Sequence, residues 1–547
     1  MHRRQVTAQQ FARMPLADRH ELLLTRLTRR GLLKTAAATV LAGAGPVLLA
    51  PRTDAATSGA ATIQARWLAF GADPRHQMSV RWQTSGPVHR PRVRLGLDQT
   101  YGREIQARPI PLTTVRADGP RLVQHYLVAE VAGLSPATRY HYQVVHDGAG
   151  GSEVASGDAT FRTAPDAGAS SGFRFTAFGD QGVTGYGAAG DAPDTMQRLA
   201  GGLEPSFHLL AGDVAYADIS GRGLAADDFV PERWGAYFRQ IDAVFRSVPL
   251  MVALGNHEME ALYSPNGYGG FEARFSTPAN GPAGCPGTYS FVYGNVGVVS
   301  LDANDVTAEF AANRGYSAGT QRAWADGRLR ALRADPDVDF VVAVFHQCAY
   351  STGGHGSDAG VRHSFASLFD RHRVDLVING HNHLYERTDP IRGGRPTLPA
   401  PSGATVLPDQ DGTTYVVVGG GGASLSGFGR IPERNDVAGH GGPDVVTAGV
   451  QGGQIEQVDW SRARYRGHCV LCVDVSPAAS STGASLRLRA LDQQGRIVDT
   501  VTLRRPAPSF TQVHEGLLVA GGVGALAVAG GAAAVLARRR TARAPGT

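Results

Sequence analysis

The sequence predicts an α/β fold: a layered β-sandwich flanked by helices, with an all-β sandwich in front of it and a C-terminal transmembrane helix after it. Three observations predict this fold. Short segments of alternating polarity fill residues 62–165, apolar strands alternate with candidate helices over residues 172–508, and a charge-free apolar run covers residues 516–537. At 547 residues, the chain is also too long for one compact core.

The first 60 residues resemble a twin-arginine export signal. Arg29 and Arg30 precede a weakly apolar run over residues 35–50, and small residues over 55–61 suit cleavage. A Leu-rich amphipathic helix that contains an arginine pair is the alternative. Because twin-arginine export machinery carries folded proteins, often with metal already bound, such a signal suits a metalloenzyme.

Residues 62–165 have the pattern of an all-β sandwich, with turn residues between short strands at 78–82, 92–95, 125–129 and 140–144. The stretch over residues 131–142 resembles the strand-to-strand corner of fibronectin type III-like domains. Since the region gathers no metal ligands or nucleophiles, we expect it to support or to recognise rather than to catalyse.

A linker rich in Pro, Gly, Ala and Ser over residues 163–171 leads into a second domain, residues 172–508. Apolar strands are predicted at 173–178, 207–211, 249–254, 340–345 and 374–378, and helices at 192–200, 231–244 and 320–334. Each of these strands ends in a polar cluster. In an α/β domain, this pattern indicates a site at the carboxyl edge of the sheet.

The polar clusters supply carboxylates, an amide, a phenol and imidazoles, a ligand set that suits Fe, Zn or Mn rather than Cu(I) or a structural zinc. Glycine beside most of them lets the backbone turn sharply. Any one cluster could be an ordinary loop, but all five in one order, each after an apolar strand, indicate one site. The clusters are Gly179–Gly182, Gly212–Tyr216, Gly255–Glu258, His346 and Gly380–His383.

With these clusters the chain resembles the purple acid phosphatases, a subfamily of the calcineurin-like metallophosphoesterases, over about residues 62–500. Tyr216 distinguishes the subfamily, because the broader superfamily usually has another residue there. The stretch Asn379–Thr388 also matches the subfamily closely. The resemblance implies the metallophosphoesterase fold behind a fibronectin-like N-terminal domain.

The resemblance further implies a dinuclear centre of Fe(3+) and a divalent Fe, Zn or Mn ion. A phenolate and two carboxylates stabilise a trivalent ion, whereas neutral imidazoles and an amide suit a divalent one. The implied ligands are Asp180, Tyr216 and His383 for the ferric ion, Asn256, His346 and His381 for the divalent ion, and Asp213 as the bridge.

Two further histidines match family positions that act on substrate. His257 corresponds to the histidine that contacts the phosphate or assists proton transfer; an ordinary loop histidine is the alternative. His355, nine residues after His346, falls where the family binds phosphate or protonates the leaving group. Plant members have adjacent histidines here, whereas His355 stands between glycines.

Other polar residues are given structural roles. Glu386 and Arg387 would hold the ligand loop or form a plain salt bridge, and His141, His208 and His372 are expected to be structural. Among the four cysteines, Cys469 and Cys472 form a C-x-x-C without a second pair for a four-thiolate zinc site. They lie in a predicted buried strand, so structural cysteines are expected.

The C-terminal apolar run, residues 516–537, is long enough to span a bilayer. Arg538–Arg540 follow directly, which places residues 538–547 in the cytoplasm. A buried helix is the alternative, although it would rarely be so rich in Gly and Ala and so abruptly flanked by charge. Together with the signal, this run predicts a catalytic domain on the extracytoplasmic face, anchored to the cell membrane.

The charge distribution argues against a nucleic-acid partner. The chain has 53 basic and 48 acidic residues. Residues 1–55 contain nine of the basic and three of the acidic residues, and the segment after Glu515 contains four basic residues and no acidic one. The middle of the chain is therefore acidic overall and offers no basic stripe to a phosphate backbone.

The resemblance implies an exported acid phosphatase that hydrolyses phosphomonoesters by attack of a hydroxide held on the dinuclear centre. A phosphodiesterase or an alkaline phosphatase-like enzyme with the same site is the alternative. A non-catalytic cell-surface binding protein is a further alternative, but it predicts lost ligands, and all seven ligand positions are filled.

Overall fold

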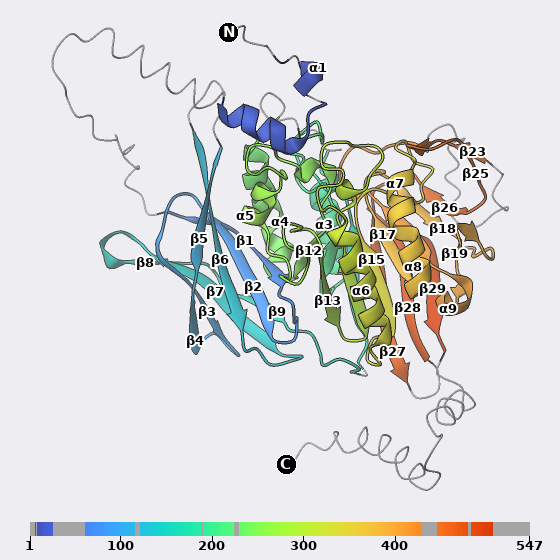
Figure 1. Cartoon of the computed structure of the whole chain (residues 1–547). Helices are drawn as coiled ribbons and strands as arrows, with labels where there is room; N and C mark the ends of the chain where they lie inside the picture. The colour runs from blue at the N-terminus through green and yellow to red at the C-terminus, as the bar shows by residue number, and fades with distance from the viewer. Residues whose placement is uncertain are drawn as a thin grey trace, which may run out of the picture.

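The structure is a computed structural model that describes residues 6, 8–11, 13–25, 61–114, 121–169, 171–186, 190–223, 229–428, 446–479 and 483–506. Figure 1 shows an all-β domain on one side and a layered α/β domain on the other. The α/β fold class with an all-β domain in front is confirmed. The predicted transmembrane run and the paired arginines lie outside the described residues. Within the part of the chain that is described, no helix has the length and apolar character needed to cross a membrane.

The all-β domain consists of two antiparallel sheets that enclose a core of buried side chains such as Trp82 and Tyr142. The first sheet has the order β1 (Ile63–Phe70), β2 (Gln77–Thr84), β6 (Leu122–Ala132) and β5 (Arg108–Thr114). The second has the order β4 (Arg103–Gln106), β3 (His89–Gly96), β7 (Arg139–Asp147) and β8 (Glu153–Ala155), and β9 (Ala159–Arg162) also pairs with β7.

The α/β domain is built on two seven-stranded sheets. The first has the order β12 (Leu250–Val252), β11 (His208–Leu210), β10 (Phe173–Phe178), β27 (Cys469–Ala479), β28 (Gly483–Asp492), β29 (Ile497–Arg505) and β21 (Thr405–Val406). The second has the order β13 (Tyr289–Tyr293), β14 (Val296–Ser300), β15 (Phe340–Val344), β17 (Leu376–Asn379), β22 (Thr414–Val418), β18 (Tyr385–Thr388) and β26 (Ser461–Tyr465). Strands β10, β11 and β12 are parallel, as are β14, β15, β17 and β22.

Helices cover the sheets from outside. On the first sheet α3 (Ala192–Gly202) packs against β27 and α4 (Glu232–Phe245), while α6 (Thr320–Ala334) packs on β14 and β15 of the second sheet, beside α8 (Ser367–His372). Shorter elements are α1 (Ala8–Phe11), η1 (Ala149–Gly151), η2 (Asn256–Glu258), α5 (Gly269–Arg274), η3 (Ala303–Asp305), β16 (Ser357–Asp358), α7 (Ala359–Val361), η4 (Arg362–Ala366), β19 (Ile391–Arg392), β20 (Arg395–Pro396), α9 (Pro408–Asp411), β23 (Val446–Ala448), β24 (Val450–Gln451) and β25 (Glu456–Val458).

The two domains share a buried interface. On β1 the ring of Trp67 stacks on Phe238 of α4 with 3.8 Å between ring centroids, and its indole N–H donates to the carbonyl of Arg274 at 3.0 Å. Arg81 on β2 donates to the hydroxyl of Ser276 at 2.7 Å. Aromatic burial combined with satisfied polar groups holds the all-β domain in one orientation against the α/β domain.

The N-terminal segment also packs on the α/β domain. Residues 16–25 are helical, and Leu16 and Arg19 are 1% and 2% exposed. The Arg19 guanidinium donates to the carbonyl of Arg222, and the Nδ1 of His20 lies 2.8 Å from the carbonyl of Ala261. The segment therefore rests on the loops that follow β11 and β12.

Candidate metal centre

The polar clusters follow parallel strands of both sheets and meet at one edge of the domain. Asp180, Asp213 and Asn256 come after β10, β11 and β12 of the first sheet; His346 and His381 come after β15 and β17 of the second. The carboxyl ends of parallel strands lie at the same edge, so the side chains of both sheets converge.

Glycine permits this close approach of the two sheets. Gly212 has a φ of +83°, and a Cβ there would lie 2.6 Å from the Nδ1 of His346. A Cβ on Gly380 would lie 2.6 Å from the carbonyl oxygen of Ala211. Both distances are shorter than side-chain atoms tolerate, so larger residues would push the sheets apart.

The first group of side chains contains Asp180, Tyr216 and His383. The Tyr216 hydroxyl lies 3.2 Å from Oδ1 of Asp180 and 3.0 Å from Nε2 of His383, and that nitrogen lies 3.2 Å from the same carboxylate oxygen. Nδ1 of His383 is 2.6 Å from the carbonyl of Ser424 and donates to it, so its Nε2 presents a lone pair to the group. Three ligand atoms thus surround one point.

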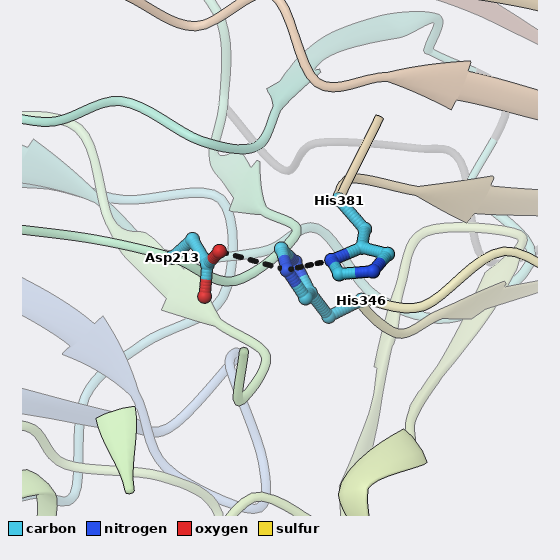
Figure 2. A group of neighbouring side chains, drawn as sticks. All are labelled: Asp213, His346 and His381. Carbon is cyan, nitrogen blue, oxygen red and sulfur yellow. Dashed lines mark hydrogen bonds and ion pairs between the residues drawn. The ribbon is translucent and has the colours of Figure 1, made fainter. Parts of the chain in front are cut away.

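The second group contains Asp213, His346 and His381 (Figure 2). Nε2 of His346 lies 3.0 Å from Oδ2 of Asp213 and 3.2 Å from Nδ1 of His381. Nδ1 of His346 donates to the carbonyl of Ala211 at 2.7 Å, which leaves Nε2 directed at the group. The same Nε2 lies 3.9 Å from Asp180, so this group adjoins the first.

Asn256 supplies a test of whether these residues fit a metal ion. Its Nδ2 donates to the carbonyl of Gly221 at 3.2 Å, whereas its Oδ1 is buried and has no hydrogen-bond partner. A buried amide oxygen without a partner costs free energy that a cation would recover. The free atom is the one that coordinates a hard or borderline metal, so the donor set fits.

The electrostatics of the site also call for positive charge. Burial opposes ionisation of Asp213, but the charges of His346 and His257 outweigh it and hold the pKa of Asp213 well below its usual range. Burial lowers the pKa of His346, yet Asp213 and Asp180 raise it to about 10. Burial and both carboxylates raise the pKa of Tyr216 well above its ordinary value. A phenolate therefore forms here only when a cation compensates for it.

The two histidines implied to act on substrate lie beside these groups. Nδ1 of His257 donates to the carbonyl of Asp218 at 2.5 Å, and its Nε2 lies 3.8 Å from Oδ2 of Asp213. His355 is at the mouth of the site: its side chain is 42% exposed, and its ring centroid lies 4.2 Å from that of His381. Eight of the nine predicted site residues are thus in contact with one another. Asn256 stands between Gly255 and His257, whose backbone N–H groups donate to Glu258 and Asp213.

Two carboxylates in the site carry no role in the sequence-based prediction. Glu258 belongs to the third cluster and accepts hydrogen bonds from the backbone N–H groups of Asp213 at 2.9 Å and Gly255 at 2.8 Å, so it joins two ligand loops. Glu309 contacts His381 and His355 and lies in no cluster. Burial raises the pKa of Glu309, but the hydrogen bonds and charges of His355 and His381 have the larger effect and lower this pKa to about 2.

Glu386 and Arg387 are each expected either to hold the ligand loop or to form a plain salt bridge, and the structure gives them different roles. Glu386 accepts hydrogen bonds from the hydroxyl of Ser351 at 2.9 Å and the N–H of Thr352 at 2.7 Å, and so anchors the loop that leads to His355. Arg387 instead forms a buried ion pair with Asp499 at 2.6 Å. Glu386 thus supports the site, whereas Arg387 belongs to a structural ion pair.

The residues expected to be structural lie away from the site. His141 pairs with Asp158 at 2.9 Å in the all-β domain, His372 pairs with Asp326 at 2.8 Å, and His208 is buried in β11. All four cysteines are buried and free.

The fold and site define a calcineurin-like metallophosphoesterase, and comparison with known proteins agrees. The calcineurin-like phosphoesterase family matches residues 173–385, and the purple acid phosphatase N-terminal domain matches residues 64–163. The chain belongs to the purple acid phosphatase-like members of this superfamily, and the resemblance stated from the sequence is confirmed. The purple acid phosphatase fold implies a dinuclear metal centre.

Individual relatives extend over most of the chain. An uncharacterized protein of Mycobacterium tuberculosis is 34% identical over 437 residues, which cover 73% of this chain and 79% of that protein. Purple acid phosphatase 15 of Arabidopsis thaliana is 29% identical over a stretch that covers 53% of this chain and 52% of that protein. Probable inactive purple acid phosphatase 27 of the same plant is also 29% identical, over 56% of this chain and 50% of that protein. The purple acid phosphatase of yellow lupin seeds shares the fold, with a TM-score of 0.62 at 21% identity over 83% of this chain and 76% of that one.

Proposed function

We propose that this protein is an active acid phosphatase that hydrolyses phosphomonoesters at a centre of one ferric and one divalent ion. The observation that carries the proposal is the convergence of six ligand atoms from two sheets, together with the unpartnered Oδ1 of Asn256 on an adjoining loop. A cation bound there would recover the free energy that this buried, unpartnered oxygen costs.

The side chains divide between the two ions by chemistry. Asp180, Tyr216 and His383 would hold the ferric ion, because an anionic oxygen set stabilises a trivalent charge. Asn256, His346 and His381 would hold the divalent ion, and Asp213 would bridge. When bound, two ions held by these residues would acidify a water molecule and offset the negative charge of the phosphoryl oxygens.

The chain's own residues would position the substrate and move protons. His257 donates its Nδ1 proton to the carbonyl of Asp218, and its Nε2 lies 3.8 Å from Oδ2 of Asp213. From there Nε2 would accept a proton or, once protonated, donate to a phosphate oxygen. His355 holds its Nδ1 toward Glu309 and leaves Nε2 free at the mouth of the site. In the imidazolium form Nε2 also carries a proton, and His355 is placed to give that proton to the leaving alcohol.

Turnover of aryl phosphates by the purified, iron-loaded protein tests the proposal. We expect release of phosphate from a mono-aryl phosphate to exceed hydrolysis of the bis-aryl diester. Asp213→Asn should lower kcat/KM by about 100-fold or more, because the bridge serves both ions. Asp326→Asn removes a buried-histidine partner outside the site and serves as the control. Two bound metal equivalents without monoester turnover would refute the proposal; faster diester turnover would favour the phosphodiesterase alternative.

We further propose that the protein leaves the cytoplasm by the twin-arginine route and stays anchored through residues 516–537. The support is the sequence pattern at both ends of the chain. Replacing Arg29 and Arg30 with Lys should block export, whereas the same change at Arg3 and Arg4, outside the motif, should not. Truncation before Gly516 should release enzyme to the medium. Full-length protein in the cytosolic fraction of export-competent cells would contradict this assignment.

A further inference from the structure

Glu309 links two histidines of the site through its two carboxylate oxygens. It lies beyond η3, and its side chain is 16% exposed. Oε2 lies 2.7 Å from Nε2 of His381, and Oε1 lies 2.8 Å from Nδ1 of His355. An ionised carboxylate only accepts hydrogen bonds, so both of these ring nitrogens carry protons.

This arrangement decides which nitrogen each histidine offers elsewhere. With its proton on Nε2, neutral His381 presents the lone pair of Nδ1, and that atom lies 3.2 Å from Nε2 of His346 in the second ligand group. With Nδ1–H committed to Glu309, His355 keeps Nε2 for another partner, and that atom carries a proton only in the imidazolium form. A carboxylate that orients a ligating histidine in this way fixes its tautomer and ring orientation and raises its basicity.

The loop around Glu309 does not depend on the Glu309 side chain. Asp358 holds the backbone, because its carboxylate accepts from the N–H groups of Ala308 at 2.9 Å and Glu309 at 3.1 Å and from the hydroxyl of Thr307 at 2.6 Å. An isosteric change of the Glu309 side chain therefore leaves the loop in place. Its effect would come from the two histidines.

We propose that Glu309 is a positioning residue that holds one ring nitrogen of both histidines at once, so that His381 offers the lone pair of Nδ1 to the divalent ion and His355, as the imidazolium, points its Nε2–H at the leaving group. The inference rests on the proposed function for its second half only. The first half concerns metal retention and can be measured without substrate.

Glu309→Gln tests the inference. A glutamine amide accepts through Oε1 but donates through Nε2, so it satisfies one of the two ring N–H groups and faces the other with a donor. We expect the divalent ion to be retained 10- to 100-fold less tightly against a competing chelator. The ferric ion and its visible absorption should be unchanged, since Tyr216, Asp180 and His383 do not contact Glu309.

The leaving-group dependence supplies the second readout. Glu309→Gln should slow the hydrolysis of aryl phosphates with basic leaving groups more than that of those with acidic ones. His355→Ala should reproduce this dependence while retaining the divalent ion. Asp326→Asn, which removes an equally short carboxylate contact to His372, should match wild type in both assays.

Unchanged divalent retention in Glu309→Gln overturns the inference about His381, and an unchanged leaving-group profile overturns that about His355. Should wild type lack monoesterase activity, the proposed function fails, while chelator competition still decides the role of Glu309 toward the metal.

Discussion

The free energy of unfolding should fall as the pH falls, because His208 takes up a proton in the unfolded chain but not in the folded one. Its imidazole is fully buried in β11 between the rings of Phe178 and Phe245, with centroid distances of 4.2 and 5.4 Å. Nδ1 contacts the hydroxyl of Thr176 at 2.8 Å, and Nε2 has no partner. Burial lowers the pKa of His208 from 6.5 to about 3.

The sign and size follow from linkage. Between pH 6.5 and about 3 the unfolded chain binds a proton at His208 that the folded chain does not, so the free energy of unfolding falls as the pH falls. Each pH unit in this window costs about 1.4 kcal/mol. Lowering the pH from 7 to 5 therefore removes about 2 kcal/mol through this one pKa difference.

His208→Asn isolates the effect, because asparagine keeps a polar group near Thr176 and does not titrate. The variant should be less stable at pH 7 by about 1–3 kcal/mol, from the lost ring volume. Urea unfolding followed by tryptophan fluorescence should show that this gap narrows by about 2 kcal/mol at pH 5. The gap at pH 7.5 and 8.5 should be equal, which serves as an internal control. A gap that stays the same at pH 7 and pH 5 would refute the reasoning.

Three further predictions concern the site and the N-terminal segment. His346→Ala should remove most activity and one metal equivalent, whereas His372→Ala should alter neither; equal losses would show that the ligand assignment is wrong. Tyr216→Phe should bleach the visible absorption of the iron-loaded protein and lower activity less than Asp213→Asn, and an unchanged spectrum would place the phenol away from the metal. Arg19→Ala should speed the tryptic removal of residues 13–25, because its buried guanidinium ties the segment to the loop at Arg222; an unchanged cleavage rate would contradict that role.

Where the sequence carries a strong local pattern, it predicts the fold closely. The strand predicted at 173–178 coincides with β10, and the helix predicted at 320–334 coincides with α6. The strand predicted at 207–211 is shorter in the structure, as β11 (His208–Leu210). Apolar neighbours of a short strand stay buried after its ladder ends, so hydrophobicity overstates the length.

Residues that act through tertiary contact could not be found in this way. Glu309 meets His355 and His381 from 46 and 72 residues away, and no motif surrounds it. Arg387 stands next to a ligand loop in sequence, yet its partner, Asp499, is 112 residues distant. The fold brings such groups together from distant parts of the sequence. The sequence around Arg387 therefore could not show whether this residue supports the ligand loop or forms a structural salt bridge.

The backbone of the ligand loops is the part of the site furthest from any sequence pattern. Asp180, Asp213, Tyr216 and His381 have φ values of +60°, +52°, +53° and +69°. For residues with a Cβ, each such conformation costs of the order of 1–3 kcal/mol and persists only where surrounding contacts enforce it.

Those contacts come from the site itself. Oδ2 of Asp180 accepts the N–H of His381 at 2.8 Å, and Glu258 accepts that of Asp213 at 2.9 Å. Carboxylates of one loop thus fix the strained backbone of another loop. The strain directs the side chains into the space between the sheets, so the ligands are preorganised by backbone geometry rather than by a choice of rotamer. A glycine precedes each of Asp180, Asp213 and His381, and a Cβ at any of the three would lie within 3.0 Å of an atom of a neighbouring loop. These glycines are the part of this geometry that can be recognised in the sequence.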